Sequence, residues 1–136
     1  MEELGFQIVY PTLDQIVEVN RRMIGSSGGY FVPPDNLRNR RSLEYVLAAV
    51  QFPLLGKLMY PAIEEKAAAL AFEIIRSHVF FDGNKRTGIH VAWMLLRSNA
   101  IMVSLDDSIV DLAVRVAVGT ASRSDLVVWL CNHLDS

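Results

Sequence analysis

The chain has 136 residues, of which 51% are hydrophobic and 21% charged, and its formal net charge is −2. These values predict one folded domain, residues 1–136, with enough apolar side chains for a core. The weak acidity excludes a globally basic protein, so we expect no direct nucleic-acid binding. A single cysteine excludes an intrachain disulfide. No apolar stretch suits a bilayer or a signal peptide, so we expect a cytoplasmic protein without a membrane partner.

Helical signals follow one another from the first residues of the chain onward. The first helix begins after a capping box of Thr12 and Gln15, whose side chains satisfy each other's backbone N–H groups, and it ends at Gly25. The second helix covers residues 42–50, and Ser42 is expected to cap it.

Two central helices flank a short polar loop. Pro61 is suited to the first turn of the third helix, which we expect to run to about Ser77. The fourth helix covers residues 84–97 and is apolar nearly all the way round. A helix without a polar face is buried on all sides, so the fourth helix is predicted to be the buried central helix of the fold.

Two further helices complete the chain. One opens at Asp106 or Asp107 and closes at Gly119, and the last follows a capping-box pattern that starts at Ser122. Residues 7–10 form the only plausible short strand. The sequence therefore predicts an all-α protein with six or seven helices, a compact single-domain bundle.

The most informative segment is residues 78–87, His-Val-Phe-Phe-Asp-Gly-Asn-Lys-Arg-Thr, between the two central helices. Backbone N–H groups at the start of a helix have no intrahelical partner, and together with the helix dipole they favour an anion. Lys85 and Arg86 stand at the helix end that usually prefers acidic residues. This placement favours a phosphate ligand over two solvated cations. The segment is not a P-loop, because Gly-x-x-x-x-Gly-Lys-Ser/Thr is absent.

Single side chains in this segment also suit phosphate chemistry. The imidazole of His78 can accept a proton from a hydroxyl nucleophile near neutral pH, or it can simply end a helix and bond to a carbonyl. Asp82 can hold a magnesium ion that bridges nucleotide phosphates, or it can cap the following helix. Gly83 allows the backbone close to a ligand, and Asn84 suits a cap or a phosphate contact. Phe80 is expected to anchor the loop in the core.

The segment resembles the Fic/Doc family pattern His-x-Phe-x-Asp/Glu-Gly-Asn-x-Arg, and most closely its Doc (death-on-curing) branch. Softer matches lie at residues 10–16, 42–51, 66–68 and 126–130. The resemblance implies a Fic-like helical bundle that uses ATP and Mg²⁺. It also implies the site residues: His78 as the catalytic base, Asp82 as the metal ligand, and Gly83, Asn84, Lys85 and Arg86 as the nucleotide-binding residues.

Family members transfer part of a nucleotide to a protein hydroxyl. Many Fic enzymes transfer AMP, whereas the Doc toxin transfers the γ-phosphate of ATP to elongation factor Tu. The AMP-transferring pattern has glycine after the asparagine and a second arginine three residues past the first, where this chain has Lys85 and Ile89. Both departures favour a Doc-like kinase toxin, although Gly83 stands where the Doc toxin has alanine. The alternatives are an AMP or UMP transferase and a non-enzymatic helical interaction module with a relict motif.

The resemblance also bears on regulation. Some Fic proteins carry an inhibitory helix with the pattern Ser/Thr-x-x-x-Glu-Gly/Asn, which occurs nowhere in this chain. We therefore expect a separate antitoxin chain, in the manner of Doc-type antitoxins, whose disordered tail folds into a helix on binding.

Overall fold

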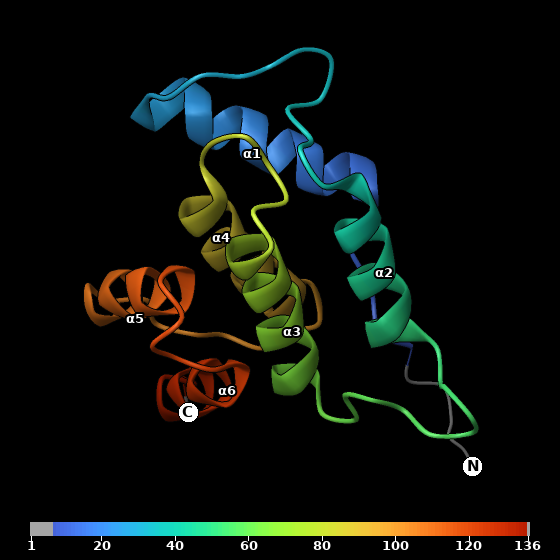
Figure 1. Cartoon of the computed structure of the whole chain (residues 1–136). Helices are drawn as coiled ribbons and strands as arrows, with labels where there is room; N and C mark the ends of the chain where they lie inside the picture. Colours follow the sequence, from blue (N-terminus) through green and yellow to red (C-terminus); the bar gives the residue numbers. More distant parts are fainter. Residues whose placement is uncertain (1–6, 136) are drawn as a thin grey trace.

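Figure 1 shows the computed structural model, which describes residues 7–135. These residues form six helices: α1 (Leu13–Ser27), α2 (Arg40–Gln51), α3 (Ile63–Arg76), α4 (Asn84–Ser98), α5 (Ser108–Ala117) and α6 (Arg123–Asn132). Residues 7–135 contain isolated β-bridges but no strand, so the all-α prediction is confirmed. None of the described helices is long and apolar enough to cross a bilayer.

Local hydrogen bonds explain most of the helix boundaries. The predicted capping boxes at Thr12 and Ser122 both form. The cap predicted for α2 is wrong, because the side chain of Asn39 accepts the Ser42 N–H at 3.2 Å and the helix starts between them. Pro61 lies before the N-cap of α3 rather than in its first turn. The two predicted capping boxes thus mark their helix starts correctly, whereas the single-residue cap predicted for α2 does not.

The strand predicted at residues 7–10 is also wrong. Val9 exchanges two hydrogen bonds with the side chain of Asn99, at 2.8 Å through its N–H and 2.9 Å through its carbonyl. These bonds satisfy the backbone without a neighbouring strand.

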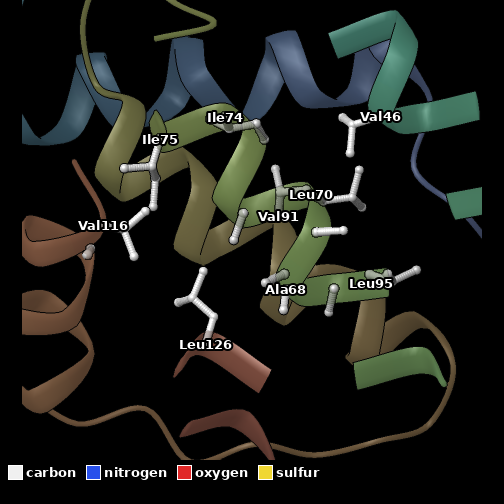
Figure 2. Close-up of a cluster of buried hydrophobic side chains, with 14 of the residues drawn as sticks. Val46, Ala68, Leu70, Ile74, Ile75, Val91, Leu95, Val116 and Leu126 are labelled. Atoms are coloured by element: carbon white, nitrogen blue, oxygen red, sulfur yellow. The ribbon is translucent and has the colours of Figure 1, made fainter. Parts of the chain in front are cut away.

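The core is centred on α3, as Figure 2 shows for the labelled side chains around it. This helix packs against α2, α4, α5 and α6, and all its residues from Lys66 to Ala71 are buried. The prediction that α4 is buried on all sides is wrong. Its residues His90 and Met94 are only half-buried, because they line a groove of about 450 Å³ against α1. α3 and α4 cross closely at Gly88, where a Cβ would lie 2.8 Å from Ile75 Cγ1.

The remaining helices divide around this central pair. Helices α1 and α2 lie on one side, and α5 and α6 lie on the other (Figure 1). The connection between α1 and α2, residues 28–39, passes the loop between α3 and α4, and Leu37 forms an antiparallel bridge with Phe80. The fold thus places a segment distant in sequence directly beside the loop that carries the motif.

Candidate functional site

Backbone hydrogen bonds fix the motif loop, residues 77–83, against the connection between α1 and α2. The carbonyl of Val79 accepts the N–H groups of Arg38 and Asn39 at 2.7 and 2.9 Å, and the Phe81 N–H donates to the carbonyl of Asn36 at 3.0 Å. The loop is therefore held by long-range pairing, and its shape depends on both segments.

His78, the second residue of this loop, has a strained backbone conformation. Its φ is +48°, in the left-handed region that a side chain other than glycine occupies at a cost of about 1–3 kcal/mol. The side chain is exposed, and its imidazole forms no hydrogen bond within residues 7–135. The Arg38 guanidinium donates to the His78 carbonyl at 3.3 Å, which helps to hold the backbone in place. The alternative of an imidazole bonded to a carbonyl is not what the structure has, and both ring nitrogens remain available for proton transfer.

Phe80 and Asn84 close the loop. Phe80 is 1% exposed, which confirms the prediction that it anchors the loop in the core. The Asn84 side chain accepts the Phe80 N–H and donates to the Phe80 carbonyl, each at 2.8 Å. The amide of Asn84 is therefore engaged in shaping the loop, and its contribution to an anion is limited to its backbone N–H.

The carboxylate of Asp82 lies between the loop and the α1–α2 connection. One oxygen accepts the Gly83 N–H at 2.8 Å, and the other accepts the Tyr30 N–H at 3.1 Å. The alternative role as the N-cap of α4 is wrong, because Gly83 is the N-cap residue and its φ is +79°. A carboxylate oxygen has a second acceptor site, so both oxygens of Asp82 can still face a cation.

At the start of α4, where the sequence predicts an anion site, the first backbone N–H groups are free of acceptors within residues 7–135. The first backbone bond of the helix runs from the Thr87 N–H to the Gly83 carbonyl at 2.9 Å. The N–H groups of Asn84, Lys85 and Arg86 have no acceptor in the part of the chain that the structure describes. The Lys85 side chain is exposed and adds a positive charge beside them.

Arg86 lies differently from the other predicted nucleotide-binding residues. Its guanidinium donates to the carbonyls of Met23 at 2.9 Å and Gly28 at 3.0 Å, at the C-terminal end of α1. Cations stabilise this end of a helix, because its last carbonyls lack intrahelical donors. Arg86 therefore holds α1 against the start of α4, and it would have to leave these carbonyls to bind a phosphate with its full fork.

Glycine at position 29 lets the connection approach the carboxylate closely. A Cβ on Gly29 would lie 2.6 Å from Asp82 Oδ2. Its φ of +117° is also one that other residues rarely adopt. Arg86 and Asp82 thus both bind the segment from Gly28 to Tyr30.

A network of buried polar side chains, which could not be seen in the sequence motif, forms hydrogen bonds to the inner side of the loop. Asn20, Asn36 and Thr87 are each 0% exposed. The amide nitrogen of Asn20 donates to the Asp82 carbonyl at 2.9 Å and to the Thr87 hydroxyl at 3.0 Å. Asn36 donates to Asn20 Oδ1 at 2.9 Å and to the Asp82 carbonyl at 3.4 Å. Four segments of the chain meet at these side chains.

One signal for this network was present in the sequence. Asn20 lies one helical turn from both Ile16 and Ile24, so it shares their buried face, and a buried amide requires partners. Asn36 follows Pro33-Pro34-Asp35 in a turn, and neither its burial nor its φ of +60° could be predicted from that pattern.

The carboxylate of Asp82 fits the oxygen-ligand chemistry of a magnesium ion. Residues 7–135 hold no cluster of three or more His, Cys, Asp and Glu side chains able to bind a metal. Magnesium keeps several waters and takes one or two protein carboxylates together with substrate phosphates. Asp82, beside the free N–H groups of α4, satisfies that description with a single carboxylate.

The amino-acid sequence is similar to those of known proteins. Residues 10–96, which include the motif loop and most of α4, match the Fic/DOC family. Toxin Doc of Mycolicibacterium smegmatis is 36% identical over 70 residues, 52% of this chain and 54% of that protein. Protein kinase doc of Escherichia phage P1 is 36% identical over 62 residues, 46% of this chain and 49% of that protein. The chain thus spans about half the length of the curated relatives it matches.

Proposed function

Because the chain belongs to the Fic/Doc family, we propose that it is a Doc-like toxin that transfers the γ-phosphate of ATP to a hydroxyl of a protein target. The observation that carries the proposal is that one loop, residues 77–83, joins the exposed imidazole of His78 to the free N–H groups of Asn84, Lys85 and Arg86. The loop thus carries a base near one end and a place for an anion at the other.

The proposed reaction assigns one role to each group. The target hydroxyl oxygen attacks the γ-phosphorus while its proton passes to the imidazole of His78, and the bond from that phosphorus to the bridging oxygen breaks to release ADP. The N–H groups at the start of α4 and the ammonium of Lys85 hold phosphate oxygens. Asp82 would hold Mg²⁺, which neutralises phosphate charge when bound.

Two positions favour phosphate over AMP as the transferred group. Lys85 replaces the glycine of the AMP-transferring pattern, so its side chain narrows the backbone cradle and adds a charge. Ile89, which is half-buried on α4, replaces the second arginine and removes a clamp on the outer phosphates. The nucleotide would then bind reversed and present its γ-phosphate to His78. One relative's name, protein kinase doc, supports the same direction.

The engagement of Arg86 refines this proposal. Its two bonds, to the carbonyl of Met23 and to that of the C-cap residue Gly28, anchor the C-terminal end of the helix that carries Asn20. The N–H groups and Lys85 are free in the described chain, so they are the first contacts for a phosphate, and Arg86 adds a contact only if it releases Met23 or Gly28.

The partners are proposed by the same analogy. We propose a translation elongation factor, as in the Doc branch, as the target, and a separate antitoxin chain as the inhibitor. Both relatives carry the name Doc, and one is named a toxin.

The test is transfer of label from γ-labelled and, separately, α-labelled ATP, with magnesium, to purified elongation factor Tu and to a cell lysate. The wild-type chain should transfer only the γ-label. His78→Ala should lower transfer by about 10²–10⁴-fold, as expected for loss of a general base. His90→Gln, on the same helix as the anion site but facing the α1 groove, is the matched control and should keep transfer.

Other outcomes separate the alternatives. Transfer of the α-label would make the protein an AMP transferase, and mass spectrometry of the target would show an adenylyl group. Absence of both labels together with absence of ATP binding by calorimetry would favour the non-enzymatic interaction module.

A further inference from the structure

Helix α5 carries an apolar face that the rest of the described chain leaves uncovered. Val110, Val114 and Val118 are 55%, 44% and 67% exposed. Residues four apart lie on the same side of a helix, so the three valines form one stripe, and Val118 continues it past the end of α5. The opposite face of α5 is buried in the core through Ile109, Leu112, Ala113 and Val116. An apolar face of this kind, rimmed by charges, marks an interaction surface.

The charged residues beside this stripe are acidic toward its N-terminal end and basic toward its C-terminal end. Asp107 and Asp111 lie at its N-terminal end, and Arg115 lies one turn further on. Arg76 is at the C-terminal end, because its guanidinium comes within 3.2 Å of the place that a Cβ on Gly119 would occupy. None of these four charged side chains is in an ion pair with another residue of the range 7–135.

The nearest acid on the neighbouring helix does not change this pattern. Asp125 of α6 lies close to Arg115, across a groove between α5 and α6. Its carboxylate accepts hydrogen bonds from the Ser122 N–H and hydroxyl, which lower the pKa of Asp125 more than Arg115 does. Arg115 thus remains without a direct partner in the described chain.

We propose that this face of α5 binds a second copy of the chain, with the two α5 helices antiparallel about a two-fold axis. In that arrangement the acidic end of each stripe meets the basic end of the other, and symmetry makes the contact twice. If the two-fold axis crosses α5 at the height of Ala113 along the helix, Asp111 lies opposite the partner's Arg115, because each of the two residues is two positions from Ala113. The helix dipoles are antiparallel as well.

The charge pattern is what selects this occupant. A parallel pairing would put acid against acid and base against base, which costs free energy. A different protein could bind here only if it offered basic groups opposite the acidic end of the stripe and acidic groups opposite the basic end. A second copy of the stripe, rotated by the two-fold axis, has its charges in that order.

The stripe on α5 lies outside the motif loop, and its C-terminal end is at Arg76, the residue before that loop. α5 packs on α3, α4 and α6, on the side of the central pair away from α1 and α2 (Figure 1). The inference rests on the exposure of the three valines and the charges beside them, and not on the proposed reaction. Since the stripe is short, the interface is smaller than a standard stable one, and a dissociation constant in the micromolar range is expected.

Sedimentation velocity of the full chain, over protein concentrations up to about 200 µM, tests the proposal. The wild-type chain should shift from monomer to dimer as the concentration rises. Val114→Glu should raise the dissociation constant at least about tenfold, because it places two like charges near the axis. Leu55→Glu is the control, because Leu55 is 96% exposed on the connection between α2 and α3, and it should leave the constant unchanged. Circular dichroism verifies that both variants fold.

Charge reversal provides a second, independent measurement. Asp111→Arg and Arg115→Asp should each raise the dissociation constant about tenfold or more, and the double variant should return it to within about threefold of wild type, because the pair is swapped rather than lost. A wild-type chain that stays monomeric, an effect of Leu55→Glu equal to that of Val114→Glu, or a double variant no better than the single ones would each overturn the proposal.

Discussion

Replacing Asn20 by leucine tests whether the buried amide network holds the motif loop. The Asn20 side chain is 0% exposed and takes part in three hydrogen bonds of 2.9 to 3.0 Å. Leucine has a similar volume and fills the space, but it neither donates nor accepts. The Thr87 hydroxyl and the Asn36 amide then lose a partner, while the Asp82 carbonyl keeps its longer bond of 3.4 Å from Asn36.

The magnitude follows from the groups left unpaired. A buried polar group without a partner costs about 1–3 kcal/mol. The Thr87 hydroxyl and one N–H of the Asn36 amide are two such groups, so the free energy of unfolding should fall by about 2–6 kcal/mol, which is a large part of the ~5–15 kcal/mol of a typical domain. Urea unfolding followed by circular dichroism measures it. Asn132→Leu, at an exposed position of α6, is the matched control and should stay within about 0.5 kcal/mol of wild type.

A local readout separates loop support from general stability. The Phe81 N–H bonds to the Asn36 carbonyl at 3.0 Å, so its hydrogen exchange should accelerate in Asn20→Leu under native conditions. The reasoning would be refuted if Asn20→Leu unfolded within about 0.5 kcal/mol of wild type and left the exchange of Phe81 unchanged.

Three further predictions concern single residues of the site and the groove. Asp82→Asn should abolish transfer or raise the magnesium requirement, and full wild-type activity in excess EDTA would contradict the metal role. His78→Gly should lose transfer yet gain up to about 1 kcal/mol in urea unfolding, because glycine relieves the positive φ; lower stability would argue against strain. Burial, and then the charge of Arg22, lower the pKa of His90 from 6.5, so the folded state resists its protonation. The free energy of unfolding should therefore fall as the pH drops below about 6.5, and less steeply in His90→Gln; identical pH profiles would contradict this.

The sequence predicts those parts of the fold that depend on neighbouring residues. The capping boxes at Thr12 and Ser122 form as expected because each side chain bonds within its own turn. The strand expected at residues 7–10 is wrong because its backbone partner, Asn99, is 90 residues away in sequence. The burial of α4 was overestimated because an apolar composition does not reveal the groove on its α1 side.

The features of the candidate site can also be divided into those that follow from neighbouring residues and those that depend on distant segments. The helix start at Asn84 with its free N–H groups and the anchoring of Phe80 could be predicted, because they follow from local sequence signals and a loop aromatic. The direction of Arg86 toward the carbonyls of α1 could not, since Arg86 and Met23 are 63 residues apart. The same holds for Asn36, whose contact with the loop exists only once the α1–α2 connection has folded over it.

Gly83 provides the test that separates a requirement of packing from a requirement of the ligand. Its φ is +79°, and a Cβ added there would lie 2.9 Å from Ile24 Cδ1 and 3.1 Å from Asn20 Nδ2. Gly56 has the same φ of +79° and nothing within 4 Å of its Cβ position, so Gly56→Ala measures the backbone cost alone, about 1–2 kcal/mol. Gly83→Ala should cost about 1–2 kcal/mol more than that, because overpacking adds to the strain.

The double variant Gly83→Ala/Ile24→Val then decides between the two requirements. Valine lacks the Cδ1 atom that the new methyl group meets, so the double variant should recover about 0.5–1 kcal/mol relative to the sum of the single changes in urea unfolding. The Doc toxin, which the motif resembles, has alanine at this position. If packing against α1 is the reason for Gly83, the double variant should keep transfer as well as stability. A stable double variant without transfer would show instead that the ligand requires a bare backbone at Gly83, and equal costs for Gly83→Ala and Gly56→Ala would remove the packing argument.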